Sequence, residues 1–352
     1  MHHSAIVLAN GHYRTGFAKT SHGLVRGPSR YPLAGVVDKD LAGQDAGTVL
    51  DGKRRNIPVF ASVRDALARL DIRPTHCVIG IATVGGFLPE GLYADLEYAA
   101  RAGLTLVNGL HHLLAEDARL AKLASKHGGG IIDIRAPRPA SELRSWSGDI
   151  LSLSTPRVAF LGTDCAVGKR TTCMMVREEC RSRGIRAEMI YSGQTGWLQG
   201  LTHGFIFDAT LNDFVCGELE GAILACHRDT QAEIILLEGQ SSLRNPSGPA
   251  GSEFLLSGAV HGVVLTHSPH RTHFVDFEEI NCRIPPIEDE IRLINLYGVD
   301  VWAITLASYG LPAADAAHAR DQLAAMVNVP VVLPLEEGVD YLADILLHKA
   351  GL

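Results

Sequence analysis

Residues 157–173 read RVAFLGTDCAVGKRTTC, and this stretch decides how the second half of the chain folds. An apolar run at 158–161 stops at Gly162, and Gly168 and Lys169 then precede a helix-compatible segment at 171–183. Glycines let the backbone curl so that successive N–H groups point inward, and a helix N-terminus adds the positive end of its dipole. Lys169 supplies a mobile positive charge for phosphate oxygens. The stretch therefore predicts a buried strand, a phosphate-binding loop at 162–172 and a helix.

Two features of this loop differ from the standard G-x4-G-K-[ST] pattern. The glycines are one residue further apart, and Arg170 stands where a hydroxyl side chain follows the lysine. That hydroxyl ordinarily binds the Mg²⁺ of a nucleoside triphosphate, whereas an arginine has no acceptor atom with which to replace it. We therefore expect the loop to bind a polyanion rather than to turn over Mg-ATP, unless a shift of register brings in a threonine. The predicted cofactor-binding residues are Gly162, Thr163, Asp164, Cys165, Ala166, Val167, Gly168, Lys169, Arg170, Thr171 and Thr172.

The amino-acid sequence of the loop also resembles that of known families. GTDCAVGK is similar to the GTD-x-x-VGK loop of dethiobiotin synthetase. Together with YSGQTG (191–196), LLEGQSSL (236–243) and HSPHRTH (267–273), the loop resembles a P-loop family long labelled a domain of unknown function. This family includes the DgcN-type D-glutamate N-acetyltransferases. GIATVGGFLP (80–89) and NGLHHLL (108–114) extend the resemblance to the N-terminal half, so it covers most of the chain.

Length and composition predict a cytoplasmic enzyme with two domains. The chain has 352 residues, whereas single cores rarely grow beyond about 250–300 residues. A net charge of −7 argues against a surface that coats nucleic acid. No apolar run reaches the roughly 18–20 residues that span a bilayer, and the N-terminus lacks the pattern of a signal peptide. Seven cysteines at irregular spacing, without C-x-x-C, indicate reduced thiols.

Strand and helix patterns alternate along both halves, which predicts an α/β fold built on parallel sheets. Residues 1–150 are expected to form a Rossmann-like domain that serves as a scaffold or dimerisation unit. Asp38 ends its second predicted strand, but no G-x-G-x-x-G follows the first, so we do not expect a nicotinamide cofactor. Residues 135–156 are predicted to be a linker with an edge strand at 150–153. Residues 151–352 are predicted to form a P-loop NTPase-like domain with strands near 158–161, 186–191, 234–237, 260–266, 301–306 and 330–333.

Polar clusters follow the predicted strands of the second half. The carboxyl ends of parallel strands meet at one edge of the sheet, where such sheets bind ligands. Glu238 ends an apolar strand, and its possible roles are general base, metal ligand, partner of a substrate ammonium, or structural partner of Lys169 or Arg170. The clusters lie at 163–172, 192–196, 208–213, 238–242 and 266–273.

Three histidines and one cysteine in these clusters invite further interpretations. His267, His270 and His273 are spaced three residues apart, but Pro269 interrupts any helix, so we expect no metal site. Cys165 is expected to be a packed loop residue rather than a carrier of an acyl group. The candidate catalytic residues are Glu238, Asp213, His267 and His270, and the candidate substrate-binding residues are Arg271, Gln194, Thr195 and Gln240.

Two functional hypotheses follow. The resemblance implies an N-acetyltransferase of amino-acid catabolism that transfers an acetyl group from acetyl-CoA to D-glutamate or a similar acidic amino acid. The alternative is an ATP-dependent ligase or kinase resembling dethiobiotin synthetase, in which Glu238 or Asp164 holds Mg²⁺. In both cases the partner is a small molecule. We expect a homo-oligomer that binds neither nucleic acid nor membrane.

Overall fold

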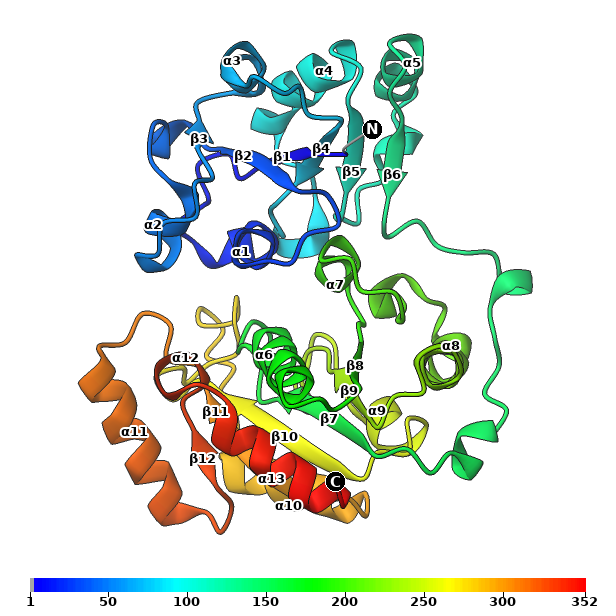
Figure 1. The fold of residues 1–352 in the computed structure, drawn as a ribbon, viewed down its shortest axis with the longest axis vertical. Helices are drawn as coiled ribbons and strands as arrows, with labels where there is room; N and C mark the ends of the chain where they lie inside the picture. The colour runs from blue at the N-terminus through cyan, green and yellow to red at the C-terminus, as the bar shows by residue number, and fades with distance from the viewer. Residues whose placement is uncertain (1–2) are drawn as a thin grey trace. The chain divides into compact units, whose positions relative to one another are not determined.

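The computed structural model describes residues 3–352 and confirms the predicted α/β class (Figure 1). Contacts within the chain define two compact units. The first unit comprises the chain up to Pro137 together with Gln194–Thr202, and the second comprises Arg138–Gly193 and His203–Leu352. The units therefore divide at Pro137, and a short segment of the second half of the sequence packs with the first unit.

A parallel sheet of six strands forms the centre of the first unit, in the order β3-β2-β1-β4-β5-β6. This is the strand order of a Rossmann fold. The apolar residues of each strand alternate between the two faces, as the period of two along a strand requires. The strands are β1 (Ala5–Leu8), β2 (Leu33–Val37), β3 (Val59–Phe60), β4 (His76–Ile79), β5 (Thr105–Asn108) and β6 (Ile131–Asp133).

Helices cover both faces of this sheet. On one face, α3 (Val63–Arg69), α4 (Tyr93–Arg101) and α5 (Ala118–Lys126) pack on the core side chains of β1, β4 and β5. On the other face, α1 (Lys19–Arg26) and α2 (Ala46–Asp51) cover only part of the sheet. The remaining part is closed by α7 (Gln194–Leu198), which comes from the second half of the sequence.

The segment 194–202 is fastened to the first unit by several kinds of contact. Leu198 is buried against Val7, Val78 and Val107 of three neighbouring strands. The guanidinium of Arg30 lies 4.2 Å from the centre of the Trp197 ring, and its Nε donates to the Trp197 carbonyl at 2.8 Å. These contacts make the segment part of the core of the first unit.

Asp38 lies at the end of β2, where a Rossmann enzyme binds a ribose, but its carboxylate is used by the protein. It accepts N–H groups from Gly11 at 2.9 Å and Tyr13 at 3.1 Å, and it is almost fully buried. Asp38 therefore holds the loop that follows β1 against the end of β2.

The second unit is built on another parallel sheet of six strands, in the order β12-β11-β10-β7-β9-β8. Its strands are β7 (Arg157–Gly162), β8 (Ala187–Ile190), β9 (Ile234–Glu238), β10 (Gly262–His267), β11 (Val301–Leu306) and β12 (Val331–Val332). The central strand β7 lies between β9 and β10, so the loops after these three strands emerge side by side.

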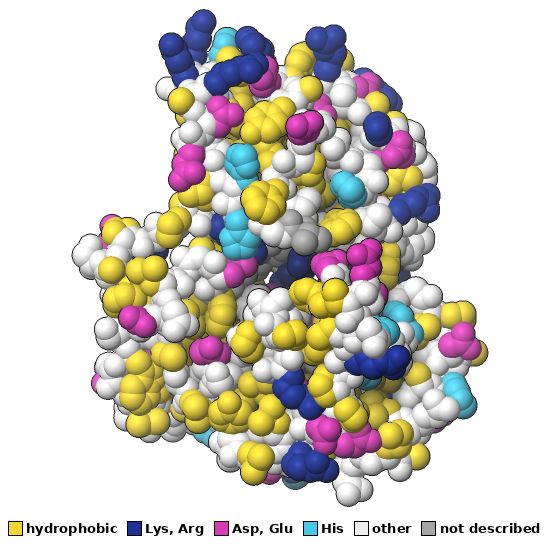
Figure 2. Space-filling view, turned by 180° about the vertical axis from the view of Figure 1, so that it is seen from behind, with side chains coloured by type: hydrophobic (Ala, Val, Ile, Leu, Met, Phe, Trp, Pro, Cys, Tyr) yellow, Lys and Arg dark blue, Asp and Glu magenta, His cyan; other side chains and the backbone are white. Residues whose placement is uncertain are grey.

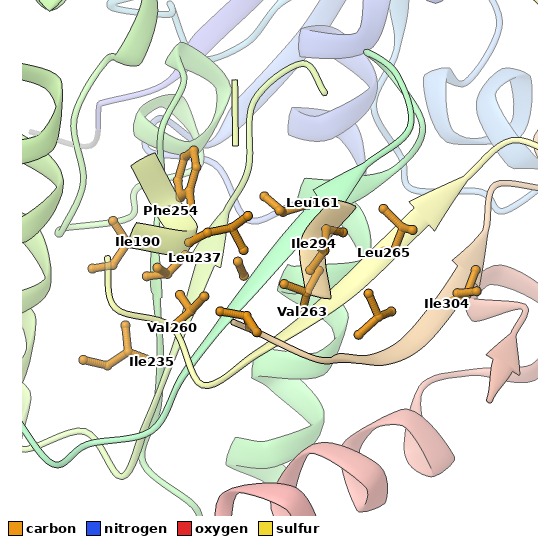
Figure 3. Packing of buried hydrophobic residues seen from close by; sticks show 14 of the residues in the cluster. Leu161, Ile190, Ile235, Leu237, Phe254, Val260, Val263, Leu265, Ile294 and Ile304 are labelled. Carbon is orange, nitrogen blue, oxygen red and sulfur yellow. The ribbon is translucent and has the colours of Figure 1, made fainter. Parts of the chain in front are cut away.

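A hydrophobic core of this unit joins one face of the sheet to helices between residues 212 and 326. Figure 3 shows Leu161 of β7, Leu237 of β9 and Leu265 of β10 packed between the helices and the sheet. The helices are α6 (Lys169–Ser182), α8 (Asn212–Thr230), α9 (Ser252–Leu256), α10 (Ile287–Leu296), α11 (Ala313–Met326), α12 (Pro334–Glu337) and α13 (Asp340–Ala350).

The predicted edge strand at 150–153 is wrong, because Asp149–Ser152 forms a short 3-10 helix. Two buried carboxylates of α8 explain this conformation. Glu218 accepts from Arg138 Nη1 at 2.7 Å and from the Arg144 N–H at 2.9 Å. Glu220 accepts from the N–H groups of Ser147 at 2.6 Å and Ile150 at 3.2 Å. The backbone donors of this segment are thus satisfied by side chains instead of a neighbouring strand.

The surface and the cysteines agree with the composition. Acidic and basic side chains are both spread over the face shown in Figure 2. All seven cysteines are free. No helix within residues 3–352 combines the length and the apolar character needed to cross a bilayer.

Candidate functional site

The loop between β7 and α6 has the geometry of an anion-binding turn. Ala166 and Gly168 adopt left-handed conformations, with φ of 53° and 95°. A Cβ at Gly162 would lie 2.7 Å from Val167 Cγ2, so only glycine fits there. Within residues 3–352, the N–H groups of Ala166, Val167 and Gly168 have no acceptor. Such donors at the N-terminus of a long helix form a binding site for phosphate groups.

Lys169, the first residue of α6, folds back over this loop. Its Nζ donates to the carbonyl of Asp164 at 2.7 Å and to the carbonyl of Ser241 at 2.6 Å. The ammonium is thereby held between the phosphate loop and the loop that follows β9. The predicted position of a positive charge at the loop agrees with this geometry.

Asp164 is fully buried and organises the loop from inside. Its Oδ2 accepts from Arg271 Nη1 at 2.8 Å and from the Val275 N–H at 2.9 Å. Its Oδ1 accepts from the Cys165 N–H at 2.7 Å and from Asn245 Nδ2 at 3.2 Å. Asp164 therefore joins the phosphate loop to the loops that follow β9 and β10.

Arg271 was predicted to bind substrate, and the structure places it on the phosphate loop. The same Nη1 that contacts Asp164 also donates to the Cys165 carbonyl at 2.7 Å. The side chain is 22% exposed. Its Nε and Nη2 have no acceptor within residues 3–352, so one edge of the guanidinium is available to a ligand.

Glu238 is the last residue of β9 and lies beside Arg170. Its Oε1 is 3.8 Å from Arg170 Nη1, and its Oε2 accepts the Ser192 N–H at 3.2 Å. The Ser192 hydroxyl donates to the Glu238 carbonyl at 2.6 Å and accepts from Gln240 Nε2 at 2.9 Å. Both Glu238 and Gln240 thus belong to one network at the end of β9, and Glu238 pairs with a loop cation.

His267 ends β10 and contacts the loop through Thr163. Its Nδ1 is 2.9 Å from Thr163 Oγ1. Burial, together with the charges of Arg271 and His270, lowers the pKa of His267 to about 4. The imidazole is therefore neutral at pH 7. His270 is exposed in the turn that follows.

The remaining loop residues have structural surroundings. Cys165 Sγ lies 3.6 Å from Ser241 Oγ. Thr172 is buried, and its N–H donates to the Gly168 carbonyl at 3.0 Å in the first turn of α6, which Thr171 shares. Residues 3–352 contain no group of three or more His, Cys, Asp or Glu side chains arranged to hold a metal ion.

Three of the predicted site residues belong to other elements of the structure. Asp213 is exposed in the first turn of α8. Gln194 and Thr195 belong to the first unit, where Thr195 Oγ1 lies 3.1 Å from Thr20 Oγ1. A Cβ at Gly109 would approach Gln194 Cγ to 2.8 Å, so Gln194 packs against the end of β5.

Sequence reasoning did not single out three residues that hold the site together. Ser192 and Ser241 lie inside the quoted motifs, so their position beside predicted residues was a usable signal. Asn245 lies outside the quoted motifs, and the fold of the loop after β9 brings it to Asp164, so no pattern in the sequence pointed to it.

The known proteins that resemble this chain include two curated relatives and a solved structure. A D-glutamate N-acetyltransferase from a Pseudoalteromonas species is 29% identical over 270 residues, covering 75% of this chain and 78% of the relative. A D-glutamate N-acetyltransferase from Tritonibacter scottomollicae is 29% identical over 278 residues, covering 76% and 80%. The crystal structure of a DUF1611 family protein from Anabaena variabilis is 30% identical, covers 98% of this chain and 99% of its own, and superposes with a TM-score of 0.87.

Family models match both halves of the chain. Residues 39–137 match the Rossmann-like N-terminal domain of DUF1611, a domain of unknown function. Residues 144–343 match its C-terminal P-loop domain, which contains every strand of the second sheet. The order and the nature of the two domains agree with the two sheets described above, and the chain belongs to the DUF1611 family.

Proposed function

We propose that this protein is an N-acetyltransferase that acts on D-glutamate or a similar acidic amino acid in amino-acid catabolism, with acetyl-CoA as the acetyl donor. The observation that carries the proposal is the shared name of two relatives that align with three quarters of the chain. The phosphate loop supports the choice of donor, because acetyl-CoA carries a pyrophosphate and a ribose phosphate.

The donor is assigned to the loop at 162–172. Three N–H groups without an acceptor in residues 3–352, the N-terminus of α6, and the side chains of Lys169 and Arg170 provide donors and positive charge for a pyrophosphate. The Thr163 hydroxyl and the neutral His267 lie on the β10 side of the same loop.

The reaction needs a base for the amine and a donor for the oxyanion. A base removes a proton from the substrate ammonium, and the free amine attacks the thioester carbonyl. The tetrahedral intermediate then collapses, the C–S bond breaks, and the CoA thiolate leaves and takes up a proton. His267 suits the role of oxyanion donor, because an imidazole that accepts the Thr163 proton at Nδ1 carries its own proton on Nε2.

Four residues compete for the role of base. A pKa of about 4 makes His267 a weak base at neutral pH. Glu238 is 5% exposed at its side chain and already accepts the Ser192 N–H and pairs with Arg170. Asp213 is exposed in the first turn of α8. We place His270 first, since it is exposed and lies close enough to His267 to lower its pKa.

The substrate carboxylates are assigned to Arg271, whose Nε and Nη2 edge faces no acceptor within residues 3–352. An arginine that is oriented by a buried aspartate can bind a carboxylate with two parallel hydrogen bonds. Gln240, whose Nε2 donates to the Ser192 hydroxyl, is assigned to substrate binding as well.

The decisive experiment measures release of free CoA from acetyl-CoA by purified protein, with D-glutamate, L-glutamate, D-aspartate or no amino acid. CoA release that requires D-glutamate or another acidic amino acid, with the N-acetyl product identified by mass spectrometry, supports the proposal. Release of ADP from ATP that depends on the amine, without CoA release, selects the ligase or kinase instead.

A further inference from the structure

The phosphate loop of a Mg-dependent nucleotide enzyme supplies the metal with oxygen ligands. A hydroxyl follows the lysine, and a carboxylate comes from a neighbouring strand. Mg²⁺ also demands near-ideal octahedral geometry and keeps several of its waters, so it needs accessible oxygens.

The residues of this loop do not fit that requirement. Arg170 replaces the hydroxyl, and a guanidinium is a donor at every nitrogen. Both nearby carboxylates are occupied by the protein. Asp164 is fully buried and receives four hydrogen bonds, and Glu238 is nearly buried, with Ser192 on one oxygen and Arg170 near the other.

Arg170 brings a second positive side chain to the loop. Arg170 lies in the first turn of α6, and its Nη1 is 3.8 Å from Glu238 Oε1 at the end of the adjacent strand β9. This carboxylate occupies the strand-end position from which a nucleotide enzyme holds its Mg²⁺. A guanidinium carries five N–H donors in a planar fork, a geometry that matches phosphate oxygens.

We propose that Arg170, oriented by Glu238, replaces the divalent cation, so that the loop binds diphosphate groups without Mg²⁺. The inference rests on the proposed phosphate loop but not on acetyl-CoA as the donor. It makes Arg170 a determinant of specificity, because the loop gains no affinity from the metal that accompanies nucleoside triphosphates.

The experiment measures the affinity of the full-length protein for inorganic pyrophosphate, ADP and CoA by calorimetry, once with EDTA and once with excess Mg²⁺. The wild-type protein should bind pyrophosphate equally well in both buffers. Arg170→Thr should weaken binding in EDTA by about 10- to 100-fold, since a charge-assisted contact is lost. Magnesium should restore part of this loss, because the substitution supplies the hydroxyl that ordinarily follows the lysine and binds Mg²⁺.

Arg177→Thr is the matched control. Arg177 lies near the middle of the same helix, is similarly buried and pairs with Glu188 at 3.2 Å. This variant should keep wild-type affinity in both buffers, which shows that losing an ion pair from α6 does not itself weaken the loop.

The outcomes separate this inference from the proposed function. A wild-type affinity that rises tenfold or more with Mg²⁺ overturns the inference, as does an Arg170→Thr variant that binds normally in EDTA. Failure of every probe to bind the wild-type protein also overturns it. Metal-independent binding of pyrophosphate and ADP without binding of CoA supports the inference and removes acetyl-CoA as the donor.

Discussion

Leu198 lies in the second half of the sequence, but its burial predicts that it stabilises the first sheet. It is 1% exposed and packs on Val7, Val78 and Val107 of the first unit. Leu198→Ala removes fully buried carbon atoms and leaves a cavity, which typically costs 2–5 kcal/mol. A cost of about 3 kcal/mol should raise the equilibrium constant for opening of the first unit by roughly 150-fold.

Hydrogen exchange followed by mass spectrometry can measure this effect region by region. Amides of β4 and β5 should lose protection in Leu198→Ala, whereas amides of β7 and β9 should keep it, because Leu198 packs in the core of the first unit. Leu296→Ala is the control, since this leucine of the second unit is 80% exposed. It should leave the exchange of both sheets unchanged.

The reasoning is refuted if exchange in β4 and β5 stays at the wild-type rate, or if only residues 194–202 exchange faster. Either result would mean that the segment rests on the sheet without contributing to its stability. The same geometry predicts that a fragment ending at Pro137 exposes the face of Val7, Val78 and Val107, and that it will not form a stable monomer.

Three further predictions concern the second unit. Gly162→Ala places a Cβ 2.7 Å from Val167 Cγ2 and 3.1 Å from Lys169 Cδ, so it should displace the loop and abolish measurable pyrophosphate binding. Gly16→Ala is the control: its Cβ would have open space around it, so it should have no effect in the same titration. The pKa of His267 is about 4 in the folded protein and 6.5 ordinarily, so the unfolded state takes up the proton at a higher pH than the folded state does. The free energy of unfolding of the wild-type protein should therefore fall by up to about 3 kcal/mol as the pH falls from 6.5 to 4. Urea unfolding should find no such loss in His267→Gln. Glu220→Gln leaves one of the Ser147 and Ile150 N–H groups facing an amide donor, so it should cost about 1–3 kcal/mol and expose residues 145–152 to proteolysis; equal digestion rates for this variant and the exposed Glu278→Gln would contradict that account.

The sequence predicted those parts of the fold that depend on local patterns. The apolar run before Gly162 and the Gly168-Lys169 pair predicted the strand, the loop and the start of a helix, because each depends on neighbours within a few residues. The alternation of strands and helices predicted two parallel sheets for the same reason.

The parts that sequence reasoning missed depend on contacts between distant residues. The segment 194–202 contains a helix of only five residues, and nothing in its composition indicates that it closes a sheet formed from residues 5–133. The predicted strand in the linker was wrong because two glutamates on α8, about seventy residues away in sequence, accept hydrogen bonds from the N–H groups of the linker. The role of Asp164 as the partner of Arg271 likewise depends on a separation of 107 residues.

The balance of charge around the loop explains why its arginines are paired. Lys169, Arg170 and Arg271 bring three positive charges to one nearly buried region, and an uncompensated set of this kind would destabilise the empty protein. Asp164 pairs with Arg271, and Glu238 pairs with Arg170. Each carboxylate is also held by the backbone: Asp164 accepts the Val275 N–H, and Glu238 accepts the Ser192 N–H. If the loop binds an anion as we propose, that anion meets cations that are already oriented, and no carboxylate has to be displaced first.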